Sequence, residues 1–86
     1  MPYLKSERKE QLKLGAVPAT PGDLNYLFTK LILEYLDNNG LSYYTINDVV
    51  GALECCKQEF YQRLVVPYER LKARTNGDVY EYHSIS

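Results

Sequence analysis

The chain has 86 residues, with ten basic against eleven acidic side chains and a formal net charge of −1. A chain this short buries only about 60–65% of the surface that its unfolded form exposes, so its own core is thin. The near-neutral charge disfavours a nucleic-acid partner, because binders of the phosphate backbone carry a basic surplus. No apolar run approaches the roughly 20 residues of a membrane span. We therefore expect a soluble single domain over residues 1–86 with no membrane contact.

Few residues are suited to catalytic or metal chemistry. Cys55 and Cys56 are adjacent, so they cannot easily bridge each other, and we expect both to be buried as small hydrophobic residues. The single histidine, His83, completes no zinc set and lies where nothing positions it as a base. Glu54 is either a helix-surface acid or a half-buried carboxyl of the catalytic kind. We expect no catalytic residue, no metal site, no cofactor and no enzymatic activity.

The first 15 residues form a polar, charged arm. Residues 7–14 can make two helical turns after Ser6, and Gly15 stops them. The apolar face of this arm is thin, so it needs a neighbour to hold it. Residues 16–19 are predicted to be an extended linker, because a residue that precedes a proline is pushed away from helical geometry.

A helix is predicted near residues 21–38. Thr20 can cap it, Pro21 suits the first helical position, and Asp23 can return a capping-box bond. Gly40 supplies a left-handed end. The apolar residues recur at helical spacing and make one broad stripe of Leu24, Leu27, Phe28, Leu31, Ile32, Tyr35 and Leu36.

A longer helix is predicted near residues 46–75, after a second capping pattern that begins at Thr45. Its helical stripe consists of Ile46, Val49, Val50, Leu53, Cys56, Phe60, Leu64, Tyr68 and Leu71. Pro67 interrupts the run, because it lacks an N–H and crowds the carbonyl of Arg63. We favour one Pro-kinked helix over two helices that meet near Val66, since the stripe keeps its phase across the proline.

These elements predict an all-α domain in which the helix near 21–38 packs on the long helix. At about 1.5 Å per residue the long helix reaches about 45 Å, and the shorter one covers only about 27 Å of it. Half of the stripe then lacks a partner within the chain, so we expect a homodimer or a higher oligomer. Residues 78–86 alternate like a strand without a partner and are expected to form an extended tail.

The C-terminal half of the long helix carries the candidate binding residues. Arg63, Arg70 and Arg74 recur at i, i+7 and i+11, so one face presents three guanidinium groups. Tyr61 and Tyr68 lie on what we interpret as an adjacent stripe. Arginine clamps phosphates in bidentate fashion and tyrosine stacks on bases, so these five residues are the candidate site for a small anionic, nucleotide-type ligand.

Two other interpretations of this face stay open. It can be an ordinary solvated surface, on which Glu59 pairs with Arg63 and Glu69 pairs with Lys72. It can also be an interface with a protein or a nucleic acid.

Motifs along nearly the whole chain resemble a family of small, mostly uncharacterised proteins encoded by tailed bacteriophages. The segments that carry the resemblance are Met1-Pro2-Tyr3, Gly22-Asp23-Leu24-Asn25-Tyr26, residues 46–55 (INDVVGALEC), Glu59-Phe60-Tyr61 with Arg63, Pro67-Tyr68-Glu69, and Asn76-Gly77-Asp78-Val79-Tyr80. The resemblance implies a phage protein that acts in the cytoplasm of the bacterial host. Small phage proteins without catalytic sites often work by binding, either to a host protein or to a nucleotide immune signal held inside an oligomer.

We therefore expect a non-enzymatic phage accessory binding protein. In the first hypothesis it counters host antiviral defence by sequestering a nucleotide-type immune signal in an oligomer. In the alternative it is an adaptor or inhibitor that docks a host or phage protein through its long helix.

Overall fold

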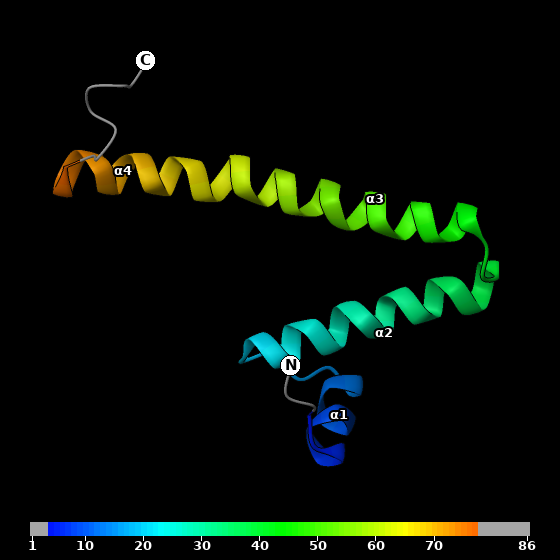
Figure 1. Ribbon diagram of the computed structural model, residues 1–86. Helices are drawn as coiled ribbons and strands as arrows, with labels where there is room; N and C mark the ends of the chain where they lie inside the picture. The colour runs from blue at the N-terminus through cyan, green and yellow to red at the C-terminus, as the bar shows by residue number, and fades with distance from the viewer. Residues whose placement is uncertain (1–3, 78–86) are drawn as a thin grey trace. The chain divides into compact units, whose positions relative to one another are not determined.

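The computed structural model describes residues 4–77, and Figure 1 shows its helices. In chain order these are α1 (Ser6–Lys13), α2 (Pro21–Asn39), α3 (Tyr43–Phe60), the π-helical turn η1 (Tyr61–Val65) and α4 (Val66–Asn76). No strand occurs between residues 4 and 77. The all-α prediction is confirmed. The predicted extended tail, residues 78–86, lies outside the described residues.

The chain divides into two compact units, residues 1–47 and 48–86, and each is described by itself. The first unit holds α1, α2 and the first turn of α3, and the second holds the rest of the long helix. The predicted packing of the helix near 21–38 on the long helix involves both units and stays a prediction. The single-domain organisation likewise stays a prediction.

An ion pair between Arg8 of α1 and Asp23 of α2 joins the first two helices. Arg8 donates to Asp23 Oδ2 from Nη2 at 2.6 Å and from Nε at 3.1 Å. Its Nη2 also donates to the Val17 carbonyl at 3.1 Å, which fixes the linker. Leu12 is the only buried apolar side chain among residues 4–77. The arm does obtain the neighbour that its thin apolar face requires, through the ion pair with the buried Asp23 carboxylate and the burial of Leu12.

The environment of Asp23 stabilises its charged form. The side chain is 2% exposed, and Oδ2 accepts a third hydrogen bond from the Ala19 N–H at 2.9 Å. The hydrogen bond from Arg8, and then the one from Ala19, lower the pKa of Asp23 to about 2. The same contact raises the pKa of the Arg8 guanidinium. Both groups therefore stay charged over the whole physiological pH range.

The predicted start of α2 is confirmed with one correction. Thr20 Oγ1 accepts from the Asp23 N–H at 3.1 Å, as an N-cap residue should, and Pro21 opens the helix. Asp23 was expected to return a bond to the cap residue. It accepts instead from Ala19, one residue earlier, because its carboxylate is turned toward Arg8. At the other end Gly40 has φ +85° and donates to the Leu36 carbonyl at 2.7 Å.

The long helix begins earlier than the sequence predicted, at Tyr43 instead of near residue 46. Ser42 caps it: Ser42 Oγ accepts from the Thr45 N–H at 3.2 Å, and Thr45 Oγ1 accepts from the Ser42 N–H at 2.9 Å. Thr45 is therefore the third residue of the helix and the reciprocal partner of the cap. It was mistaken for the cap itself because either hydroxyl residue can fill that position.

Pro67 does not divide the long helix. The Val66 N–H bonds the Tyr61 carbonyl, five residues back, so the backbone passes through the π turn η1 immediately before the proline. A π turn accommodates one extra residue. Pro67 has no N–H to donate to the Arg63 carbonyl, and the wider turn relieves the clash between that carbonyl and the proline ring. Of the two alternatives, one continuous helix from Tyr43 to Asn76 is confirmed.

Replacing Asp23 by Asn should lower the melting temperature at neutral pH by several degrees, because the half-buried Arg8 guanidinium would face an uncharged group. The folded pKa of Asp23 lies below the ordinary value of about 3.9, so its contribution is complete above about pH 4. It is lost as the pH falls from about 4 to about 2, and the Asn variant should lack this component of acid destabilisation. Thermal melts followed by circular dichroism at pH 7 and pH 2 measure both effects.

The matched control for this change is Glu34→Gln. Glu34 pairs with Lys30 at 3.5 Å on the surface of α2, and its side chain is 61% exposed. A surface pair of this kind contributes little, so the melting temperature should stay unchanged. Equal losses in the two variants would show that the buried pair has no special role.

Candidate functional site

The long helix displays a row of apolar side chains that its own unit leaves uncovered. We call this row the apolar stripe, and it consists of Val49, Leu53, Cys56, Phe60, Leu64, Tyr68 and Leu71. Val49 is half-buried and the other six are exposed. Phe60, which the pattern placed in a core, is 57% exposed. One helix cannot bury its own apolar face, and no other described element belongs to this unit.

The π turn keeps this stripe on one side of the helix. Before Phe60 the stripe residues lie four and seven positions away, at Cys56 and Leu53. After Phe60 they lie four and eight positions away, at Leu64 and Tyr68. The additional position on the C-terminal side corresponds to the extra residue that a π turn inserts. The two halves of the stripe therefore stay in phase across the proline.

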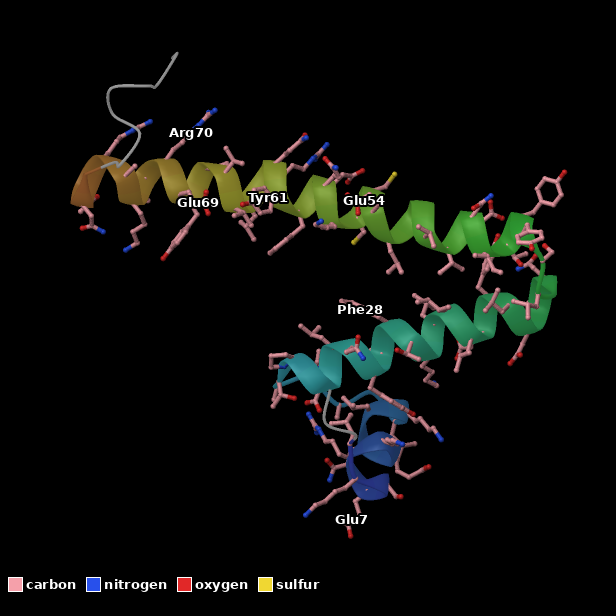
Figure 2. The ribbon with its side chains drawn as sticks, in the orientation of Figure 1. Glu7, Phe28, Glu54, Tyr61, Glu69 and Arg70 are labelled. Carbon is pink, nitrogen blue, oxygen red and sulfur yellow. The ribbon has the colours of Figure 1, made fainter. Side chains whose placement is uncertain are left out.

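Of the three candidate arginines, Arg63 lies in η1, and Arg70 and Arg74 lie on α4. Arg63, Arg70 and Arg74 follow one another at close to whole numbers of turns, and Figure 2 shows Arg70 extending outward from α4. Arg63 and Arg70 are exposed and Arg74 is near the C-terminal end of α4. None of the three guanidinium groups has a hydrogen bond or an ion pair with a residue of the described range 4–77. Three cations without a described partner make this face available to anionic groups.

Each candidate tyrosine lies two residues before a candidate arginine. Tyr61 is two residues from Arg63, and Tyr68 is two residues from Arg70. Residues two apart lie about 200° apart around a helix and do not face each other. The placement of the two tyrosines on a stripe adjacent to the arginines stays a prediction. Tyr68 belongs to the apolar stripe, and Tyr61 lies at its edge.

The surface ion pairs expected on this face do not form among the described residues. Neither Glu59 with Arg63 nor Glu69 with Lys72 makes an ion pair within residues 4–77. Lys72 Nζ lies instead 5.7 Å from the ring centroid of Tyr68, where a cation is attracted to the face of the ring. These side chains are all exposed, and the choice among a solvated surface, a ligand site and an interface stays open.

Charge is unevenly distributed along the long helix. Residues 43–60 carry three acidic side chains and one basic, for a net −2. Residues 61–76 carry four basic side chains and one acidic, for a net +3. The two halves meet at Phe60, the middle of the apolar stripe. Any partner that lies along this helix therefore meets an acidic half and a basic half.

The remaining candidates for chemistry lie on the surface or outside the described range. Cys55 and Cys56 are free and exposed, so the prediction that both are buried is wrong, for the same reason that Phe60 is exposed. Glu54 accepts from Gln58 Nε2 at 3.2 Å and lies 3.9 Å from Lys57 Nζ, as a helix-surface acid does. His83 lies outside the described residues.

Residues 4–77 provide neither a metal site nor a membrane-spanning helix. No group of three His, Cys, Asp or Glu side chains is placed to hold a metal ion there. No helix of this part of the chain combines the length and apolar character needed to cross a bilayer.

Comparison with known proteins identifies a family for this chain. No curated protein and no solved structure matches it. A family model, described as a domain of unknown function (DUF6899), matches residues 1–79, which include the whole first unit and the whole apolar stripe. The chain therefore belongs to the DUF6899 family.

Proposed function

We propose that the chain is a non-enzymatic binding protein that docks on another protein through the apolar stripe of its long helix. The observation that carries this proposal is the continuity of the helix from Tyr43 to Asn76, with the stripe exposed along it. Contiguous exposed apolar surface commonly marks a protein interaction site. A helix presents such a surface to a groove or to another helix through residues at i, i+3, i+4 and i+7.

The exposed arginine face favours a second function, the capture of an anionic ligand of the nucleotide type. Its support is the absence of an ion-pair partner for Arg63, Arg70 and Arg74 among residues 4–77. Because Tyr61 and Tyr68 lie across the helix from these arginines, an aromatic ring that stacks on the ligand would come from a second copy. Capture between subunits agrees with that requirement.

The biological setting of both functions comes from the resemblance to phage proteins. In that setting the chain is an accessory protein in the host cytoplasm. The docked partner is a host or phage protein, and the captured ligand is a signal of host antiviral defence. Neither function involves catalysis.

The docking function predicts that one charge on the stripe abolishes partner retention. Tagged wild-type chain and its Leu64→Asp variant are incubated with host lysate that also contains the untagged chain, and retained proteins are identified by mass spectrometry. Wild type should retain one dominant protein that Leu64→Asp loses. Leu64 is exposed, so this variant should lose less than about 1 kcal/mol of unfolding free energy.

Gln62→Asp is the matched control for Leu64→Asp. It adds the same charge two residues away, on the opposite side of the helix, and Gln62 is exposed as well. It should retain the same protein as wild type. If all three chains retain the same set, the stripe is not a docking surface.

The ligand function predicts a rise in melting temperature with a nucleotide, because a ligand that binds only the folded chain stabilises it. Linear and cyclic mono- and dinucleotides are the probes, and differential scanning fluorimetry is the measurement. Arg70→Ala should weaken binding about tenfold to a hundredfold, and Arg70→Lys should recover only part, because an ammonium lacks the planar fork. Lys57→Ala, a cation on the same helix away from this face, should bind as wild type does. Equal binding by Arg70→Ala and wild type would exclude the arginine face.

A further inference from the structure

The apolar stripe is arranged almost symmetrically about Phe60. Cys56 and Leu64 lie four residues to either side, and Val49 and Leu71 lie eleven residues to either side. Leu53 and Tyr68 lie seven and eight away, and the difference is the extra residue of the π turn. A stripe of this kind matches itself when it is reversed. Self-matching is the property that a twofold interface requires, since residue i must meet j while j meets i.

The charges along the helix favour the same arrangement. When two copies pair in parallel, the acidic half lies on the acidic half and the basic half on the basic half. When they pair antiparallel, residues 43–60 at net −2 lie along residues 61–76 at net +3, twice in each dimer. Complementary halves attract and like halves repel, so charge selects the antiparallel orientation.

Among the described helices, only the long helix itself is as long as the stripe requires. The long helix joins 18, 5 and 11 residues of α3, η1 and α4, and α2 has 19 residues. At about 1.5 Å per residue these lengths are about 50 Å and about 28 Å. The stripe itself, from Val49 to Leu71, spans about 33 Å, so α2 is somewhat shorter than the stripe, whereas a second long helix matches it from end to end.

Two charges beside the centre identify the register. Glu59 directly precedes Phe60, and Arg63 directly precedes Leu64. Each charged residue is therefore rotated by about 100° around the helix axis from a stripe residue, in the same direction, so Glu59 and Arg63 lie on the same flank of the stripe. A twofold axis at Phe60 brings that flank opposite the same flank of the second copy. Glu59 of each copy then lies opposite Arg63 of the other. Neither residue has an ion-pair partner among residues 4–77.

We propose that the partner of the apolar stripe is a second copy of the chain, paired antiparallel about Phe60, with Glu59 of each copy opposite Arg63 of the other. This inference rests on the proposed docking function and names its partner. In the pair, Phe60 meets Phe60, Cys56 meets Leu64, and Leu53 meets Tyr68.

Charge reversal tests the pairing in the intact chain. Glu59→Arg places two arginines at each junction of the dimer, and Arg63→Glu places two glutamates there. Each variant alone should raise the dissociation constant of the dimer by about tenfold or more, because like charges would face each other twice. Sedimentation velocity over a concentration series measures the constant. Glu10→Arg, which makes the same charge change on α1, should dimerise as wild type does.

An equimolar mixture of the two variants is the decisive sample. At one junction of the mixed dimer, the arginine introduced into one variant lies opposite the glutamate introduced into the other. At the second junction, the retained Arg63 of the first variant lies opposite the retained Glu59 of the second. The mixture should therefore regain the wild-type dissociation constant, and native mass spectrometry should show the heterodimer.

A bond within one chain cannot produce this rescue, because neither variant contains both signs at these two positions. Circular dichroism verifies that each variant is folded, and Phe60→Asp provides a second disruption of the same centre.

A mixture that dimerises no better than its components would overturn the pairing. A dimer dissociation constant that neither charge reversal changes would overturn it as well. A wild-type chain that stays monomeric at every concentration would also overturn it. The docking function fails separately, when wild type and Leu64→Asp retain the same proteins from lysate. A monomeric wild type that retains a host protein, which Leu64→Asp loses, would leave the docking function intact and refute only the self-pairing.

Discussion

The missing N–H of Pro67 is the constraint on which the long helix and its surface depend. A proline in a helix interior removes a hydrogen bond and clashes with the carbonyl four residues before it, at a cost of about 3 kcal/mol or more in a regular helix. This chain routes the backbone around the clash, since the Val66 N–H reaches the Tyr61 carbonyl five residues back. A break at this point would have produced two short helices with independent faces. The π turn instead gives one stripe that is long enough to match another long helix.

The N-terminal unit resolves a different difficulty, the shortage of apolar side chains. Leu12 is its only buried apolar residue within the described chain, so the arm is held mainly by the bonds that Arg8 makes to Asp23 and Val17. A buried ion pair contributes orientation more reliably than it contributes stability, because both charges must be desolvated. It also makes the two partners mutually dependent, since either charge left alone would be buried without compensation.

The sequence was sufficient for those features that depend on residues close together in the chain. The ends of α2 are set by Thr20, Pro21 and Gly40, through hydrogen bonds between residues three or four positions apart. The stripe around Phe60 shows the helical period of the long helix. The choice between Ser42 and Thr45 as cap could not be made from the sequence, because each hydroxyl bonds the other's backbone N–H.

Features that depend on distant residues could not be predicted. Asp23 was recognised as a capping acid, but Arg8 lies 15 residues away and no local pattern connects the two. The arginine face followed directly from its spacing. The grouping of Tyr61 and Tyr68 with the arginines stays a prediction, and an offset of two residues places neighbouring members such as Tyr68 and Arg70 on different sides of the helix.

The small amount of apolar surface that the described chain buries has a consequence for its thermodynamics. A chain with one buried apolar side chain between residues 4 and 77 gains little stability from its own contacts, so whatever covers the stripe becomes part of its folding equilibrium. A partner that binds only the folded state adds RT ln(1 + [L]/Kd), a quantity that grows with concentration. The apparent free energy of unfolding of such a chain depends on protein concentration, just as it depends on temperature and pH. A melting temperature measured in dilute solution and one measured in a crowded cell would then describe two different equilibria.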